Sequence, residues 1–128
     1  MKIPEDLLYS REHEWIRIEG DIGSIGITDY AQHHLGDIVF VELPDLDLEV
    51  DQGDPLVVIE SVKAVASIFS PAAGTVTAVN EELETSPELL NEDPYENWIA
   101  RIEISDAGIR QDLMSAQDYA AFCQSQED

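Results

Sequence analysis

Basic residues are scarce in this sequence. Its 128 residues include 6 Lys plus Arg against 28 Asp plus Glu, and the formal net charge is −22. Nucleic-acid binding depends on basic side chains that neutralise phosphates, and anionic membrane surfaces attract basic segments. We therefore expect no nucleic acid and no membrane among the partners. The acidic surface serves either solubility or steering toward basic partner surfaces.

Long apolar runs and cysteines are also lacking. No apolar run approaches the roughly 18 residues that a transmembrane helix needs. The first residues, from Met1 to Asp6, resemble neither a signal peptide nor an amphipathic presequence. We therefore expect a cytoplasmic bacterial protein, or a mitochondrial one only if a presequence has been removed. Cys123 is the only cysteine, which excludes an internal disulfide and a zinc motif.

What the sequence does contain is a series of short strand patterns. Alternating or continuous apolar residues predict strands at 15–19, 24–27, 38–43, 56–59, 65–69, 75–79 and 98–104. Four residues of the last strand should face one side: Trp98, Ala100, Ile102 and Ile104. The acidic segment 82–93 is interpreted as loop or short helix. Together with the length, the pattern predicts a single mostly-β domain over residues 1–128.

Two helices have recognisable ends. Thr28 is the expected N-cap of a short helix with Asp29 in its first turn, and Gly36 is a natural C-terminal stop. A C-terminal helical segment is expected at about 106–124, where Ser115 resembles an N-cap. Its buried stripe would consist of Tyr119, Phe122 and Cys123.

Lysine occurs only twice, as Lys2 in the N-terminal tail and as Lys63 in the middle of the sequence. Lys63 lies between the apolar runs at 56–59 and 65–69, which together predict a hairpin. A hairpin tip holds an ammonium group away from the body on a flexible four-carbon stem, within reach of a modifying enzyme. The ordinary alternative is a solvated turn lysine.

The segment Glu60-Ser61-Val62-Lys63-Ala64 resembles the lipoylation motif of the glycine cleavage system H-protein family. From about Tyr9 to Phe122, further segments resemble that family in order and spacing: His13-Glu14-Trp15, 26–32, 35–44, Ser70-Pro71 with Gly74, and Asn91-Glu92-Asp93-Pro94-Tyr95 before Trp98. The resemblance implies a barrel-sandwich hybrid of the lipoyl and biotinyl carrier type. Two antiparallel sheets would present the lysine on an exposed hairpin, with short helices that include a C-terminal one.

The resemblance also implies a function. Lipoate would be attached to Lys63 through an amide, within a recognition motif formed by Glu60, Ser61, Val62 and Ala64. The chain would be a non-enzymatic carrier that supplies no catalytic residue. It would shuttle the aminomethyl group of glycine between glycine decarboxylase, aminomethyltransferase and dihydrolipoamide dehydrogenase, which are the P, T and L proteins. A lipoyl-attaching enzyme would be a fourth partner, and the carrier should act as a monomer.

A cleft for the loaded arm is a further implication of the resemblance. An ammonium end group in a cleft needs a carboxylate nearby, and Glu14 is the candidate. By alignment, His34 is a second candidate for arm docking. The plain alternatives are a solvated acid at a strand edge and a surface histidine. The sequence departs from the family pattern at Ser67, where an acid is common, and at Glu12, where a small hydroxyl residue can occur; we hypothesise that Glu12 compensates.

Other carrier interpretations use the same lysine. A biotin carrier would have methionines at the positions of Val62 and Ala64. A 2-oxo acid dehydrogenase lipoyl domain usually has Asp in place of Val62. A lipoyl relay, which donates its acyl chain to other lipoyl enzymes, stays open as an alternative. An independent enzyme would need convergent catalytic groups, and the sequence shows none.

Overall fold

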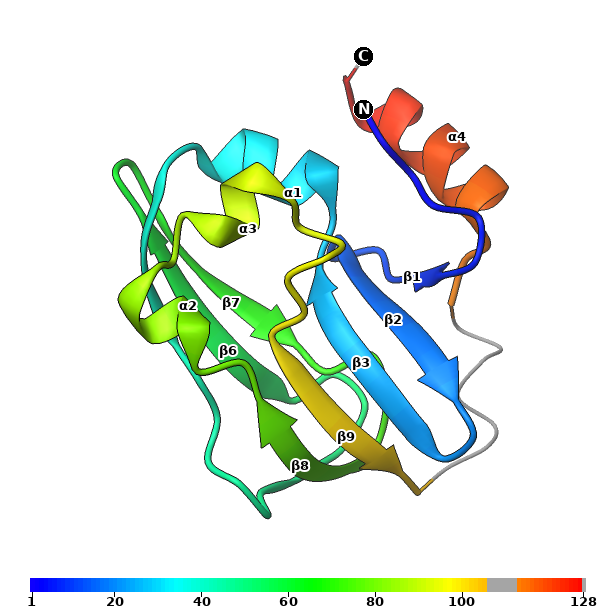
Figure 1. The fold of residues 1–128 in the computed structure, drawn as a ribbon. Coiled ribbons are helices and arrows are strands. Elements are labelled where there is room, and N and C mark those ends of the chain that lie inside the picture. Colours follow the sequence, from blue (N-terminus) through cyan, green and yellow to red (C-terminus); the bar gives the residue numbers. More distant parts are fainter. Residues whose placement is uncertain (106–112, 128) are drawn as a thin grey trace.

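The structure, a computed structural model, describes residues 1–105 and 113–127. Two antiparallel sheets form its body, and α1, α3 and α4 lie toward the same end of the molecule (Figure 1). In spatial order, the larger sheet consists of β1 (Leu8–Tyr9), β2 (Glu14–Glu19), β3 (Ile22–Ile27), β9 (Ala100–Ile104), β8 (Gly74–Val79) and β5 (Glu49–Val50). The smaller sheet consists of β4 (Ile38–Glu42), β6 (Pro55–Ser61) and β7 (Val65–Phe69). The predicted fold class is confirmed.

The main core lies between the two sheets. Because successive strand residues point to opposite faces, each strand contributes alternate apolar side chains to it. Ile16, Ile25 and Ile102 come from the larger sheet, and Ile59 and Ile68 come from the smaller one; all are at most 4% exposed. The core thus fixes the register of the β6–β7 hairpin relative to the larger sheet.

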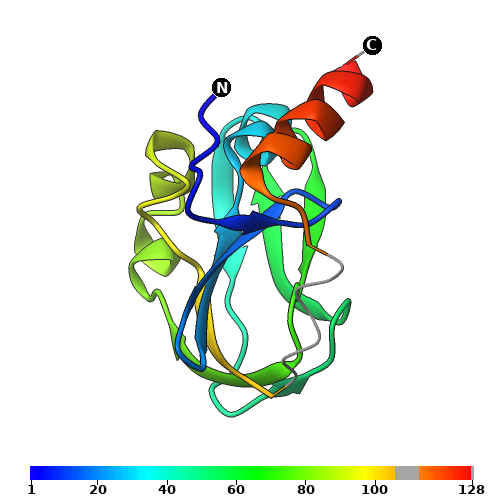
Figure 2. The ribbon, with the colours of Figure 1, turned by 90° about the vertical axis from the view of Figure 1, so that its right-hand side faces the viewer.

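A second, aromatic core lies under helix α4 (Ala116–Glu127). The Tyr9 and Tyr119 rings stack with their centroids 4.6 Å apart, and Cys123 is buried beside them in the same cluster. Both views show α4 lying over β1 (Figures 1 and 2). Asp118 N–H donates to Ser115 Oγ at 3.2 Å, so the expected N-cap of this helix is confirmed.

Helix α1 (Asp29–Leu35) begins and ends at the expected residues. Thr28 Oγ1 accepts a hydrogen bond from the Ala31 N–H at 3.2 Å, as an N-cap should. Gly36 ends the helix with φ 76° and ψ −154°, a conformation that is almost restricted to glycine. The chain can therefore turn sharply from α1 into β4.

Some expected boundaries differ from those observed. β9 begins at Ala100, so Trp98 precedes the strand, and the Arg101 guanidinium lies 3.9 Å from a Trp98 ring centroid. Ala100 and Ile102 do face the core together. The acidic segment forms two short helices, α2 (Glu82–Thr85) and α3 (Leu89–Glu92). Helix α4 starts at Ala116 and continues to Glu127; the part of the expected helical segment at 106–112 lies outside the described residues.

Candidate modification site and its adjoining pocket

Lys63 lies in the turn between β6 and β7, as the sequence predicts. The register pairs Glu60 with Val65, which leaves residues 61–64 as the tip of the hairpin. The hairpin (green) projects at the same end of the molecule as α1 (Figure 1). Lys63 is exposed, and within residues 1–105 and 113–127 the single ion pair joins Arg17 to Asp6. The Lys63 ammonium group therefore forms no ion pair with a carboxylate of the described residues.

Ser61 organises the turn around the lysine. Its Oγ accepts hydrogen bonds from the Lys63 N–H at 3.3 Å and from the Ala64 N–H at 3.0 Å. The Ser61 N–H donates to the Ala64 carbonyl at 2.8 Å. These bonds satisfy the Lys63, Ala64 and Ser61 backbone donors and hold the conformation of the turn, from which the exposed Lys63 side chain projects.

The segment that follows α1 supports the same turn from outside the hairpin. The Val62 N–H donates to the Asp37 carbonyl at 3.0 Å. The Lys63 stem runs beside Gly36: a Cβ placed on that glycine would lie 3.4 Å from Lys63 Cε and 3.9 Å from Nζ. These are ordinary van der Waals distances, so the glycine at position 36 is required by its positive φ rather than by the nearby lysine.

Exposed apolar side chains, here called the apolar collar, lie on the lysine turn and on the neighbouring strand β4. The four residues are Val39, Phe40, Val62 and Val65. Val62 and Val65 are each 68% exposed, and Val39 and Phe40 lie on β4, at the outer edge of the smaller sheet. Clustered exposed apolar side chains are typical of surfaces that bind other molecules.

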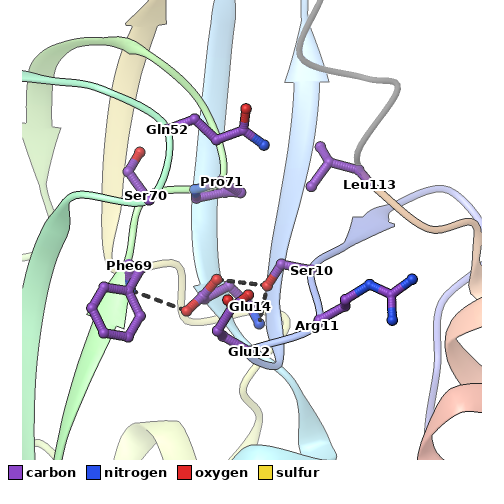
Figure 3. A pocket seen from close by; sticks show the side chains of 10 residues that line it. Ser10, Arg11, Glu12, Glu14, Gln52, Phe69, Ser70, Pro71 and Leu113 are labelled. Atoms are coloured by element: carbon purple, nitrogen blue, oxygen red, sulfur yellow. Dashed lines mark hydrogen bonds between the residues drawn. The ribbon is translucent and has the colours of Figure 1, made fainter.

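A pocket of about 520 Å³ opens beyond the end of β7 (Figure 3). Ten residues from several segments line it: Ser10, Arg11, Glu12, Glu14, Gln52, Gly53, Phe69, Ser70, Pro71 and Leu113. The pocket combines three charged side chains with a few apolar ones. It can therefore hold a flexible chain that ends in a charged group.

Glu14 is the buried acid of this pocket. It is 1% exposed, and its carboxylate accepts hydrogen bonds from Ser10 Oγ at 2.6 Å and from the Phe69 N–H at 3.0 Å (Figure 3). Burial raises its pKa to about 7, against the two hydrogen bonds, which lower it. The alternative of a solvated acid at a strand edge is wrong, because the Glu14 side chain is buried and β2 lies between β1 and β3 in the sheet.

The two positions at which the sequence departs from the family pattern lie in different places. Glu12 is exposed and lines the same pocket as Glu14. Ser67 is exposed on β7, between Val65 and Phe69 on the outward face, and is not one of the lining residues. Glu12 therefore does not stand in the place of the acid that is common at position 67, and the hypothesis that it compensates stays a prediction.

His34 lies away from Glu14, on the last turn of α1. Its Nδ1 is 3.0 Å from the Tyr30 carbonyl, and its ring stacks on the Tyr30 ring at 4.1 Å. It lines a separate depression with Met1, Asp29 and His33. Its side chain is exposed, so the plain alternative of a surface histidine agrees with its position.

No group of three or more His, Cys, Asp or Glu side chains in residues 1–105 and 113–127 is arranged to hold a metal ion. Over the same part of the chain, no helix is both long and apolar enough to cross a membrane.

Comparison with known proteins decides the family. The model of the glycine cleavage H-protein family matches residues 7–126. The chain belongs to this family. A glycine cleavage system H protein of Syntrophomonas wolfei is 56% identical over 127 residues, which cover 99% of the chain and 98% of the relative. One of Alkaliphilus oremlandii is 52% identical over 126 residues, covering 98% of the chain and 99% of the relative.

A solved structure agrees with the sequence relatives. The crystal structure of an H protein from Mycobacterium marinum superposes with a TM-score of 0.85 at 35% identity, covering 93% of the chain and 97% of that structure. The H-protein family consists of lipoyl-bearing carriers, and the chain is accordingly a lipoyl carrier of the glycine cleavage system.

Sequence reasoning missed several groups of this H-protein site. Ser10 and the Phe69 N–H bind Glu14, but nothing in the sequence pairs them with it, because they come from separate elements. Asn91 lies in a segment that resembles the family, although the motif does not reveal that Asn91 binds the backbone of Gly36 and Ile38.

Proposed function

We propose that lipoate is attached to Lys63 Nζ through an amide. The observation that carries this proposal is the exposed lysine on a fixed turn, with no carboxylate engaging its ammonium group within residues 1–105 and 113–127. The remaining motif residues, Glu60, Ser61, Val62 and Ala64, flank it, and Ser61 holds the turn. The apolar collar gives an attaching enzyme a surface to contact.

The chain itself contributes position and protection. When bound, lipoate supplies a dithiolane that accepts the aminomethyl group of glycine and carries it between enzymes. The hairpin holds the attachment point away from the body, so that an attached group can enter the active sites of large partners. We assign no side chain of this protein an acid, base or nucleophilic role, and the protein is thus a carrier rather than an enzyme.

The Glu14 pocket is proposed as the resting place of the loaded arm. Val65, Ser67 and Phe69 share the outward face of β7, which leads from the lysine turn to the pocket. A strand rises about 3.3 Å per residue, so β7 covers roughly 13 Å from Val65 to Phe69. An ionised Glu14 would accept a hydrogen bond from the ammonium end of the cargo, and the walls would exclude water from it.

Glu12 and His34 have lesser roles in this proposal. Glu12 lines the same pocket as Glu14 and, from its exposed position, adds attraction for a cation at the pocket mouth. His34 is proposed to contact the arm close to Lys63, since it lies next to the Gly36 turn.

The partners follow from the family. We infer that glycine decarboxylase, aminomethyltransferase and dihydrolipoamide dehydrogenase receive the loaded arm in turn, and that a lipoyl-attaching enzyme modifies Lys63. The net charge of −22 favours partners with basic surfaces around their active-site entrances. A monomeric carrier in the cytoplasm of a bacterium fits this exchange among several large enzymes.

Intact-mass measurement and peptide mapping test the attachment. The chain offers Lys2, Lys63 and the N-terminus as its only amines, so the site can be assigned cleanly. After incubation with lipoate, ATP and a lipoate-attaching enzyme, we expect one lipoyl group on Lys63, an unmodified K63R variant, and a K2R variant modified like the parent chain. An unmodified parent chain beside a modified control carrier would overturn the proposal, and so would a biotinyl mass after co-expression with a biotin ligase.

A further inference from the structure

Asn91 of α3 binds the backbone on both sides of Asp37. Its Oδ1 accepts a hydrogen bond from the Ile38 N–H at 2.9 Å, and its Nδ2 donates to the Gly36 carbonyl at 2.8 Å. Nδ2 also lies 3.1 Å from Gln32 Oε1, on α1. One amide side chain thus satisfies a donor and an acceptor of the segment that joins α1 to β4.

The same segment supports the lysine turn on its other side. The Asp37 carbonyl accepts a hydrogen bond from the Val62 N–H at 3.0 Å, and Gly36 lies against the Lys63 stem. A continuous series of contacts therefore runs from Asn91 through residues 36–38 to the residue before the lysine. The Val62–Asp37 bond extends the pairing of β4 with β6, in which Ile38 lies opposite Ser61, to the residue before the lysine.

We propose that Asn91 is a positioning residue for Lys63, which it presents to the modifying enzyme by fixing the Gly36–Ile38 segment. This inference rests on the proposed function of Lys63 as the attachment site. The proposal gives a role to the Asn91–Tyr95 segment, which takes no part in the proposed lipoyl chemistry.

The physical need for such a residue comes from Gly36. Its backbone conformation lies in a region that glycine alone tolerates, and glycine also has the greatest freedom to leave it. Without the Asn91 bonds, residues 36–38 would sample other conformations, and the Asp37 carbonyl would release Val62. α3 is a firm base for the amide, because Leu90 on the same helix is completely buried.

The expected effect is on binding rather than on chemistry. If only a fraction of the free chain presents the lysine turn correctly, the apparent affinity for the enzyme falls by that fraction. The bound enzyme then restores the pose, so the rate at saturation is kept. For N91A we expect the KM for the carrier in the attachment reaction to rise about fivefold with kcat unchanged, which converts to about 1 kcal/mol.

N97A is the matched control. Asn97 is half-buried like Asn91, and its Nδ2 also donates two hydrogen bonds, to the Leu89 and Asp93 carbonyls, but it does not touch residues 36–38. A general weakening of α3 would affect both variants alike. Positioning affects N91A alone.

Amide hydrogen exchange of the unmodified, full-length chain gives a second readout that does not depend on attachment. In N91A the Val62 amide should exchange about fivefold faster, in line with the KM change, while the Ile59 amide in the middle of β6 keeps its protection. N97A should leave Val62 exchange at the parent value. If N91A does not fold, N91D replaces it, because that variant keeps the acceptor for Ile38 and loses the donors to Gly36 and Gln32.

The two proposals fail in different ways. If the parent chain is not modified at Lys63, the proposed function is wrong, whatever Val62 exchange shows. If the parent chain is modified and the folded Asn91 variant matches N97A in KM and in Val62 exchange, the positioning role is overturned. A fall in kcat with KM unchanged would also overturn it, because that would place Asn91 in the reaction step.

Discussion

The Phe69 backbone N–H donates a hydrogen bond to the Glu14 carboxylate, with 3.0 Å between the nitrogen and Oε2. This bond joins the first residue of β2 to the last residue of β7, and thereby one sheet to the other. An ionised carboxylate in this place lowers the stability of the folded chain, because burial disfavours its charged form. The acid therefore connects the pocket both to folding stability and to proton binding.

Stability should consequently depend on pH through Glu14. Folding raises its pKa from 4.5 to about 7, so between these values the folded chain binds the proton more tightly than the unfolded chain. The Glu14 contribution to stability is present below pH 4.5 and is lost as pH rises to 7. At pH 8 we expect E14Q to be more stable than the parent chain by up to about 3 kcal/mol, and the difference should vanish toward pH 4.5.

Urea unfolding at several pH values between 4.5 and 8 measures this difference. E19Q is a suitable control, because Glu19 is an exposed acid on the same strand. Parallel pH profiles for E14Q and the parent chain would contradict the buried-acid interpretation.

Removal of the Glu14 charge should also expose the cargo of a loaded carrier. We expect E14Q to lose its aminomethyl group to hydrolysis about tenfold faster at pH 8, since a charge-assisted hydrogen bond contributes about 1.5 kcal/mol or more. H34A should change the rate less, because His34 lies outside the Glu14 pocket. Timed release of formaldehyde from the isolated carrier measures the loss. Equal rates for E14Q and the parent chain would argue against docking at Glu14.

Deletion of the Ser61 hydroxyl should loosen the lysine turn with little effect on global stability. S61A removes the acceptor of the Lys63 and Ala64 N–H groups, which are exposed and can donate to water instead. We expect the Ala64 amide to exchange about fivefold faster, corresponding to about 1 kcal/mol of local stability. S67A, on the neighbouring strand, should leave that amide unchanged. Similar exchange in S61A and S67A would show that the hairpin alone holds the turn.

Thr28 should be among the most sensitive hydroxyl groups of the chain. Its Oγ1 caps α1 and also lies 2.7 Å from the Tyr119 hydroxyl, which itself lies 2.7 Å from His13 Nδ1. Because Thr28 is completely buried, T28V should lower the free energy of unfolding by about 2 kcal/mol, from a lost cap and an unpaired buried partner.

T77V is the matched control for Thr28. Thr77 is an exposed residue whose hydroxyl donates to the Arg101 carbonyl at 3.3 Å, and its loss should cost less than about 0.5 kcal/mol. Chemical denaturation of both variants gives the comparison. If their losses are equal, Thr28 does not link α1 to α4 in the way that the structure indicates.

The strands were predictable because their apolar alternation matches burial on one face. β8 and β9 follow this rule most clearly, whereas β2 and β3 are buried on both faces along much of their length. Thr28 and Gly36 are residue types that favour helix ends locally. The prediction was wrong at Trp98: its side chain fits an inward position in the alternating pattern, yet β9 begins only at Ala100. An alternating pattern does not show where strand pairing starts, since pairing depends on the neighbouring strands.

The site divides in the same way. The position of Lys63 in a hairpin turn was predictable from the apolar runs that flank it, and the scarcity of lysine in the composition drew attention to it. The burial of Glu14 was not, because its partners, Ser10 Oγ and the Phe69 N–H, come from other segments of the chain. Asn91 shows the same limit, since its partners at residues 36 and 38 are more than 50 positions away.

Because its turn is held by hydrogen bonds, the hairpin is a fixed attachment point, and the Lys63 side chain is the single flexible link to a load. A load on Lys63 would sweep a small volume around one point, and a docked partner would meet it at an effective concentration on the order of millimolar. That concentration is set by tether length and does not depend on how much carrier is present in bulk. The rate of transfer between the enzymes would then depend on which of them is bound at the hairpin, rather than on the diffusion of a free intermediate.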